Sequence, residues 1–464
     1  MFTGREKELK ALARLYESGK FEFAVIYGRR RVGKTALINQ FIGDKEAIYF
    51  TGVESNAAQN LLNLSGAIME HALGISGGSF ESFQAALEYV FKLARTRRLI
   101  FVIDEYPYAA RAEAALASTL QMLIDKYKAD SKLMLILCGS SVSYMEDEVL
   151  AYKAPLYGRR TAQIRLLPFD FSETCAYCKG FSNEDKALVY GIVGGTPQYL
   201  SLLDDRLTIG ENIRALFLNP ASALFDEPIS LLRQEIREPA IYNAIISAIA
   251  SGCTRMSEIA AKAGESTSSC SVYLKSLINL GLIRKEFPYG EETSKKAIYK
   301  IEDNMFRFWY RFVPDNIAAI SRGAGDVVLK RMLEQLSHHM GSVFEDICAE
   351  YMWRLLAKGQ LQPEFGSLGR WWGNDPALKQ QTEIDLMAAR DNKAIFCECK
   401  WTNEKADKSV LETLDHRAHL FNYGENTLFV FSKAGFTEGC RQEAERLGNV
   451  RLIDYNDILT ELCD

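Results

Sequence analysis

The segment at residues 28–35, Gly-Arg-Arg-Arg-Val-Gly-Lys-Thr, constrains the chain most strongly. A short apolar run at 23–27 precedes it and a helical pattern at 36–42 follows it. Such a loop between a strand and a helix turns successive backbone N–H groups toward phosphate oxygens, whereas the alternative interpretation is a plain glycine turn. The segment predicts a nucleotide-phosphate site formed by Gly28, Arg29, Arg30, Arg31, Val32, Gly33, Lys34 and Thr35.

Two side chains of this loop have separate expected tasks. Lys34 is expected to reach the β- and γ-phosphates, and the Thr35 hydroxyl is expected to ligate Mg²⁺. The N-terminus of the helix that follows adds its dipole to the site. We therefore expect a nucleoside triphosphate with Mg²⁺ as the ligand.

Strand and helix patterns alternate through the first 200 residues. Runs that are apolar on both faces indicate buried parallel strands, and β–α alternation indicates a parallel sheet covered by helices. We predict an α/β fold whose first domain is a three-layer P-loop sheet. The five predicted strands are 23–27, 47–50, 99–103, 133–137 and 162–167.

Acidic and hydroxyl residues follow two of these strands. Asp104 and Glu105 come directly after the run at 99–103, at the strand end where such sheets bind ligands. Asp104 is expected in the Mg²⁺ shell and Glu105 as the general base that activates water. Ser140 and Ser141 end the next run and are expected either to contact the γ-phosphate or its water, or to cap a helix.

Two arginines precede the fifth predicted strand. Arg159 or Arg160 can neutralise charge in the transition state of phosphoryl transfer, as an arginine finger does. The alternative interpretation is an ordinary pair of surface arginines.

The middle of the chain predicts a winged helix. Helical patterns at 241–252, 257–265 and 268–283 precede a hairpin pattern that ends at 296–301. Residues 237–303 hold nine Lys/Arg and eight Asp/Glu, so this domain has almost no net charge to attract phosphate. A protein contact is therefore the alternative to DNA binding. An aromatic segment at 305–313 is predicted to be a packing helix. The candidate DNA contacts are Ser269, Ser271, Lys275, Lys295 and Lys296.

The C-terminal region predicts a hairpin with a candidate nuclease site. Strand patterns flank Asp391-Asn392, and a two-residue turn there places Asp385 opposite Glu398. Lys400 then shares the face of Glu398. Two carboxylates can hold Mg²⁺ or Mn²⁺, and a nearby lysine can orient water for attack on a phosphodiester. A three-residue turn would spoil this pairing, and a salt-bridged surface is the alternative.

Composition limits the other possibilities. The chain has 55 Lys/Arg and 60 Asp/Glu, a net charge of −5, so nucleic-acid contact has to be local. The ten cysteines lack a framework spacing, and the single C-x-x-C at Cys175 and Cys178 has no second pair for a zinc site. The N-terminus does not resemble a signal peptide, and no apolar run approaches the length of a membrane span. We expect a cytoplasmic protein.

Several blocks resemble the archaeal-type ATPases of the AAA-related signal-transduction class with numerous domains. These blocks are residues 2–9, 28–35, 101–105, 138–141, 156–160 and 194–200. The resemblance implies an adenine nucleotide, a small helical lid, and a nucleotide pocket lined by Gly195 and Pro197. It also favours Arg159 over Arg160.

The C-terminal part resembles the restriction-endonuclease-like domain that follows the ATPase and winged helix in many members. The resembling blocks are residues 344–345, 369–372, 383–385 and 398–401. By this resemblance Asp385, Glu398 and Lys400 form the active-site triad, and Glu345 is a fourth acid on a helix.

The sequence thus predicts three domains. They are a P-loop ATPase domain with a lid at 1–235, a winged helix with its aromatic helix at 236–325, and a nuclease-like domain at 326–464. The expected function is an ATP- and Mg²⁺-dependent switch coupled to a nuclease-like domain acting on DNA. The alternatives are a signalling or regulatory scaffold that binds without cutting and a transcription regulator. The expected partners include a second copy of the chain or another protein.

Overall fold

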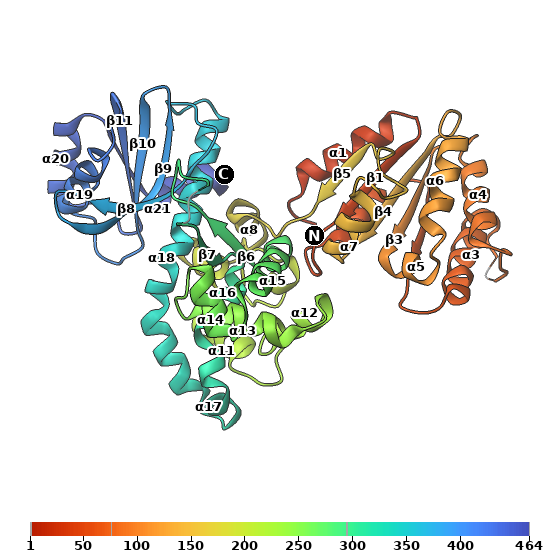
Figure 1. The fold of residues 1–464 in the computed structure, drawn as a ribbon, viewed down its shortest axis with the longest axis horizontal. Coiled ribbons are helices and arrows are strands. Elements are labelled where there is room, and N and C mark those ends of the chain that lie inside the picture. The colour runs from red at the N-terminus through yellow and green to blue at the C-terminus, as the bar shows by residue number, and fades with distance from the viewer. Residues whose placement is uncertain (1, 76, 294–295, 464) are drawn as a thin grey trace. The chain divides into compact units, whose positions relative to one another are not determined.

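The computed structural model describes residues 2–75, 77–293 and 296–463. The chain folds into two compact units (Figure 1). The first unit contains the residues up to Pro168 together with Thr196–Gln198, and the second contains Phe169–Gly195 and the chain from Tyr199 onward. The domain borders predicted at 235 and 325 stay predictions, because the two compact units meet at other positions in the chain.

The first unit is built on a five-stranded sheet in the order β2-β3-β4-β1-β5, with every neighbouring pair parallel. This confirms the predicted α/β class and all five strand positions. The central strands are buried on both faces because their Leu, Ile and Val runs have no polar side to expose. The strands are β1 (Glu22–Tyr27), β2 (Ala47–Thr51), β3 (Leu99–Asp104), β4 (Leu133–Gly139) and β5 (Ala162–Arg165).

Helices cover both faces of this sheet (Figure 1). Leu12 of α1 and Leu37 of α2 pack in one apolar cluster with one face of the sheet, while Phe91 of α4 packs with Phe21 and Tyr127. The helices are α1 (Glu6–Glu17), α2 (Lys34–Ile42), α3 (Ala57–Leu73), α4 (Phe83–Leu93), α5 (Tyr106–Ala112), α6 (Leu116–Tyr127), α7 (Val142–Tyr144) and the π-helix η1 (Met145–Leu150). A short helix, α10 (Pro197–Leu200), begins in this unit.

The second unit begins with helices and continues with a helix–hairpin module, which we define as residues 239–301. Its three helices and antiparallel hairpin have the order that the sequence predicts. The helices of this part of the unit are α8 (Phe171–Tyr177), α9 (Asn183–Val193), α11 (Ile209–Phe217), α12 (Glu227–Glu235), α13 (Pro239–Ala250), α14 (Met256–Ala263) and α15 (Thr267–Asn279). The hairpin strands are β6 (Ile283–Glu286) and β7 (Ile298–Ile301).

The aromatic segment forms α16 (Asn304–Phe312), which is a packing helix. Trp309 donates its indole N–H to the carbonyl of Phe225 at 2.7 Å, and the Tyr310 hydroxyl donates to Asn243 Oδ1 at 2.7 Å. The Phe308 and Phe312 rings are buried against neighbouring aromatic side chains. The 3₁₀ turn η2 (Pro314–Asn316) and α17 (Ile317–Ser321) lead to the long helix α18 (Gly325–Ala357).

A mixed five-stranded sheet in the order β12-β11-β10-β9-β8 completes the second unit. Its neighbours β8–β9 and β9–β10 are antiparallel, and β10–β11 and β11–β12 are parallel. Helices α18 and α21 cover one face and α19 and α20 the other, each with its own apolar cluster. The bounds are β8 (Gly369–Asp375), β9 (Gln380–Arg390), β10 (Lys393–Lys400), α19 (Lys408–Ala418), β11 (Glu425–Ser432), α20 (Glu438–Leu447), β12 (Val450–Asp454) and α21 (Tyr455–Cys463).

Helices α8 and α9 pack on the C-terminal body. Phe171 and Ala187 lie in the same apolar cluster as Phe344 of α18 and Ile458 of α21. The stretch after Pro168, which the sequence assigns to the ATPase domain, therefore packs with the second unit. None of the described helices is both long and apolar enough to cross a membrane.

Candidate active sites

The phosphate loop connects β1 to α2 at the carboxyl end of the sheet. Gly28 has φ 154°, and a Cβ there would lie 2.2 Å from the carbonyl oxygen of Leu166, so a side chain has no room. Gly33 caps α2 with φ 91°. These glycines give the loop the backbone conformation that a phosphate cradle needs, directly before a helix N-terminus.

The Lys34 side chain lies over this loop. Its ammonium donates to the carbonyl oxygens of Gly28 at 2.8 Å and Arg29 at 2.9 Å. Val32 is buried in the cluster beneath α1 and α2, and Arg5 donates to the Val32 carbonyl at 3.2 Å. Contacts of Val32 therefore fix the loop on the core, and the Lys34 ammonium lies beside the loop backbone that a phosphate would contact.

The arginines of the loop contact other parts of the first unit. Arg29 is buried and donates to the Thr196 hydroxyl at 2.7 Å, and Arg30 donates to the Tyr108 hydroxyl at 2.7 Å. Arg31 contributes a backbone turn with φ 73°. Pro197, next to Thr196, has its Cγ 3.7 Å from the position of a Cβ built on Gly33, so this segment adjoins the loop.

Asp104 lies at the end of β3 and accepts hydrogen bonds on both carboxylate oxygens. Its Oδ2 accepts from the Thr35 hydroxyl at 3.0 Å and from the Tyr49 hydroxyl at 2.6 Å, and its Oδ1 accepts from the Glu105 N–H at 2.9 Å. Burial, followed by the Asp104 carboxylate, raises the pKa of the Tyr49 phenol, which therefore stays protonated. A threonine hydroxyl beside an aspartate is the oxygen pair that Mg²⁺ takes in P-loop proteins, so these residues fit the ion.

Glu105 has an unusual backbone and one close side-chain partner. Its φ is 48°, in the left-handed region that non-glycine residues rarely adopt. Its Oε2 accepts from the Ser140 hydroxyl at 2.7 Å and from the Ser140 N–H at 3.3 Å. Ser140 therefore holds the candidate base, while Ser141 stands at the N-cap of α7 without a side-chain cap bond.

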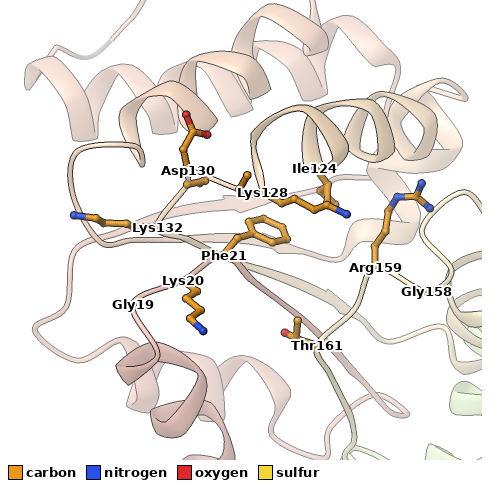
Figure 2. Close-up of a pocket in the computed structure, with 12 residues that line it drawn as sticks. Gly19, Lys20, Phe21, Ile124, Lys128, Asp130, Lys132, Gly158, Arg159 and Thr161 are labelled. Carbon is orange, nitrogen blue, oxygen red and sulfur yellow. The ribbon is translucent and has the colours of Figure 1, made fainter.

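Arg159 lies away from these groups. It precedes β5 and lines a pocket of about 620 Å³ with the segments before β1 and β4, at the amino ends of the strands (Figure 2). The phosphate loop is at the opposite, carboxyl ends. Arg159 forms a two-pronged ion pair with Asp125, with distances of 2.6 and 3.0 Å, and Arg160 lies over the Tyr157 ring. Arg159 therefore does not lie beside Lys34 and Asp104 within one chain, because residues before and after parallel strands lie at opposite sheet edges.

The C-terminal hairpin has the predicted register. Arg390 pairs with Lys393 and Leu386 with Cys397, one step before Asp385 and Glu398. The turn residues Asp391 and Asn392 have φ 51° and 64°, as a two-residue type I′ turn requires. The predicted two-residue turn is therefore confirmed, and the three-residue turn is not formed.

Asp385, Glu398 and Lys400 line one cavity. The carboxylate of Glu398 accepts from the Lys400 ammonium at 2.6 Å through Oε1 and from Arg417 at 2.9 Å through Oε2. Asp385 Oδ2 accepts from the Cys399 N–H at 2.8 Å. Both carboxylates are buried, and Lys400 and Arg417 compensate the charge of Glu398.

Glu345, the acid expected on a helix, lines the same cavity from α18. Arg370 of β8 lies 3.9 Å from it and also pairs with Glu383. Burial raises the pKa of Glu345, and burial followed by Glu398 and Glu345 raises the pKa of Asp385 to about 7. The predicted set Asp385, Glu398, Lys400 and Glu345 is therefore in one place.

The fit of this site to a divalent ion rests on two carboxylates. Across the described residues, no three His, Cys, Asp or Glu side chains gather closely enough to hold a metal. Mg²⁺ commonly takes one or two protein carboxylates and keeps several waters, so Asp385 and Glu398 suit it as a pair. The ion pairs of Glu398 with Lys400 and Arg417 would compete with such an ion.

The other candidate residues occupy ordinary positions. Ser271 and Lys275 are exposed on α15, and Ser269 bonds to Ser266. Lys296 pairs with Glu291 at 3.0 Å, and Lys295 lies outside the described residues.

The C-x-x-C cysteines are buried thiols. Burial raises the pKa of Cys178 to about 12, and a hydrogen bond with Cys463 together with burial raises that of Cys175. Both therefore stay protonated and unreactive at neutral pH.

Several residues that contact the candidate site residues were not predicted. Tyr49 and Thr196 contact Asp104 and Arg29 in the first unit, and Arg417 and Arg370 contact the acids of the second. Tyr49 is a polar group in an otherwise apolar strand, a pattern that could have marked it. Nothing local marks Arg417, which lies in a charged helix.

The fold and loop together define a class, a Walker-type P-loop ATPase with a C-terminal mixed-sheet domain. Residues 2–203 match the family described as an ATPase domain predominantly from Archaea, and residues 309–411 match one of archaeal and bacterial proteins of unknown function. An uncharacterized protein of Methanocaldococcus jannaschii is 31% identical over 462 residues, which cover 98% of this chain and 100% of that protein. The chain therefore belongs to the family of archaeal ATPases that carry this C-terminal domain.

Two further proteins are similar to parts of this chain. An uncharacterized ATP-binding protein of the same archaeon is 46% identical over 46 residues, which are 10% of this chain and 78% of that protein. The Walker-type ATPase of Pyrococcus abyssi has a TM-score of 0.51 at 20% identity, covering 67% of this chain and 96% of that one. This structural likeness establishes the shared fold.

Proposed function

We propose that this ATPase is a nucleotide-controlled switch coupled to a metal-dependent nuclease site acting on DNA. The observation that carries the nuclease part is the gathering of Asp385, Glu398 and Lys400 in one cavity, with Glu345 at its side. Two carboxylates and a lysine are the groups that phosphodiester hydrolysis needs in such a site.

In the ATP site, each residue has a proposed task. The loop N–H groups and Lys34 bind the phosphates, and Thr35 and Asp104 hold Mg²⁺, which supplies charge neutralisation at the phosphates. Glu105 takes the proton of the attacking water, and Ser140 orients the Glu105 carboxylate. Tyr49 positions Asp104 through its hydroxyl. Arg159 of the same chain lies at the opposite edge of the sheet, so an arginine finger at this position would come from Arg159 of a second copy.

In the nuclease site, Asp385 and Glu398 would hold Mg²⁺, which supplies Lewis-acid polarisation of a phosphate. Lys400 lies at the same edge and can orient a water through its ammonium. The ten cysteines are all free thiols, which supports a reducing, cytoplasmic setting for both activities.

A cleavage assay tests the nuclease proposal. Full-length protein with Mg²⁺ or Mn²⁺ is compared with Asp385→Ala and Lys400→Ala on labelled DNA, and Lys405→Ala serves as the control because Lys405 is an exposed lysine of the same domain. We expect both site variants to lose on the order of 100-fold or more in rate, while the control keeps it. Equal cleavage by all four proteins would exclude this site as its source.

A binding scaffold is the second candidate. The observation that favours it is that Lys400 and Arg417 already pair with both oxygens of Glu398, as in a structural ion-pair cluster. Absence of cleavage on every DNA and RNA substrate, together with retained ATP binding, would favour this alternative.

A further inference from the structure

The cavity of the candidate nuclease site has a second wall. Its volume is about 690 Å³, and Asp385 and Lys400 line one side. The helix–hairpin module lines the other with Tyr299 and Lys300 of β7, and α16 adds Arg311. The volume falls in the range of small-molecule pockets, which admit a few nucleotide-sized groups and not a double helix.

This second wall is bonded to the C-terminal sheet. The Tyr289 hydroxyl in the loop after β6 donates to the carbonyl of Ala389 at 3.3 Å and accepts from its N–H at 2.8 Å. The Tyr289 N–H donates to the carbonyl of Arg370 on β8 at 2.9 Å. The hairpin loop therefore packs on the edge of the sheet that carries Asp385.

Ion pairs join the same two parts beneath the cavity. Arg284 of β6 lies 2.8 Å from Asp346 of α18, and Arg307 of α16 lies 3.4 Å from the same carboxylate. Arg307 also donates to the Ser342 hydroxyl at 3.1 Å. A duplex could reach Asp385 only by displacing a wall that these bonds hold.

One cation at the cavity lacks a carboxylate partner. Lys300 pairs with Glu286 and Arg417 with Glu398, whereas Arg311 has no acidic partner among the described residues. Burial alone lowers the pKa of Arg311, so nearby charge does not compensate for its partial desolvation. A half-buried guanidinium facing a cavity with an aromatic side chain suits the phosphate and base of a single strand.

We propose that this cavity binds a single-stranded segment of nucleic acid, that Arg311 contacts its phosphate, and that the bonded hairpin excludes an undistorted duplex. The proposal rests on the nuclease-like function proposed for the same site and names its substrate class. A duplex carries a denser negative charge than a single strand. If charge attraction alone decided binding, the protein would therefore prefer the duplex.

Fluorescence anisotropy of the full-length protein in EDTA tests binding without cleavage. The probes are a labelled oligothymidine of about 12 nucleotides and a duplex of equal length. We expect the single strand to bind at least about tenfold more tightly, and Arg311→Gln to weaken it by about tenfold. The slope of log K against log salt should fall by about 0.7 in Arg311→Gln, because one phosphate contact is lost.

Two further variants separate charge from folding. Arg311→Lys should restore most of the salt slope, and Arg322→Ala, an exposed arginine after α17, should leave it unchanged. Equal or tighter duplex binding, or an unchanged slope in Arg311→Gln, would overturn the proposal.

The failure of the nuclease proposal is visible separately. Preferential single-strand binding without metal-dependent cleavage would leave the substrate class standing and remove the nuclease activity. Cleavage of a duplex that is lost in Lys400→Ala would support the nuclease activity and contradict the single-strand substrate class.

Discussion

The two candidate active sites hold their carboxylates in opposite ways. In the ATP site, Asp104 accepts from the hydroxyls of Thr35 and Tyr49, and Glu105 accepts from that of Ser140. In the C-terminal site, Lys400 and Arg417 pair with Glu398. Neutral donors orient a carboxylate without neutralising its charge, so it can still bind a metal or a proton. A paired cation neutralises that charge, so a metal has to compete with the cation.

The two sites therefore differ in whether a metal can bind the carboxylates without first displacing a cation. The acids of the ATP site are oriented by hydroxyl and backbone N–H donors. In the second site, two basic side chains pair with Glu398, so a metal or substrate phosphate at Glu398 must first replace an ion pair. Four experiments can break or sharpen this contrast.

Replacing the candidate base should have the largest effect. Glu105→Gln keeps the size of the side chain and an oxygen for the Ser140 hydroxyl, but it cannot accept a proton. We expect ATP affinity within about twofold of wild type and turnover lower on the order of 10²–10⁴, measured by calorimetry and phosphate release. Glu70→Gln, an exposed acid of the same unit, is the control. Unchanged turnover would remove Glu105 as the base.

Acidification should weaken the second unit through a buried histidine. His339 donates from Nε2 to the carbonyl of Gly191 at 2.9 Å, and burial lowers its pKa to about 3. The folded state binds this proton less readily than the unfolded state, so the stabilisation is complete above an unfolded pKa of about 6.5 and is lost as pH falls.

Between about pH 7.5 and about pH 4.5, this linkage amounts to about 2.5 kcal/mol. Denaturant unfolding at both pH values measures it. His339→Gln keeps an N–H donor but does not titrate, so between the two pH values its free energy of unfolding should fall by that amount less than in the wild type. His338→Gln should behave as wild type. Parallel losses in all three proteins would refute the assignment.

Releasing one ion pair should make the second site resemble the first. Among the described residues, Arg417→Gln leaves Glu398 paired with Lys400, so we expect Mn²⁺ affinity to rise about tenfold in calorimetry. Arg446→Gln breaks the exposed pair with Glu443 and should have no effect. Weaker or unchanged Mn²⁺ binding would mean that Arg417 does not compete with a metal at Glu398.

The smallest effect is expected at Tyr49. Tyr49→Phe removes the hydroxyl bond to Asp104 and keeps the ring. The Mg²⁺ concentration for half-maximal ATPase activity should rise about fivefold, because a hydrogen bond to a charged group contributes about 1 kcal/mol or more. Tyr152→Phe, at an exposed tyrosine, should change nothing. An unaltered Mg²⁺ dependence would show that the Tyr49 hydroxyl does not position Asp104.

Local patterns predicted much of this molecule. The loop from Gly28 to Thr35 is contiguous and lies between an apolar run and a helical pattern, so local sequence predicts the strand, the turn and the helix. The register of the C-terminal hairpin followed from Asp391 and Asn392, whose types favour the left-handed backbone of a tight turn.

The remaining contacts join parts distant along the chain. Tyr49 and Asp104 are 55 residues apart, and Arg29 and Thr196 are 167 apart, and no spacing rule links such pairs. Arg159 was assigned by resemblance to a known pattern. Its position before a parallel strand was itself the signal that it lies at the opposite edge from the loop.

The route of the chain near Thr196 limits how this protein can be divided. The chain leaves the first unit after Pro168, returns for Thr196–Gln198, and leaves again. A fragment ending at Pro168 would keep the whole sheet yet lose the hydroxyl that Arg29 of the phosphate loop contacts. A fragment long enough to keep Thr196 would carry α8 and α9 without the C-terminal helices that bury them. We therefore expect the first truncation to loosen the phosphate loop and the second to expose the apolar faces of α8 and α9.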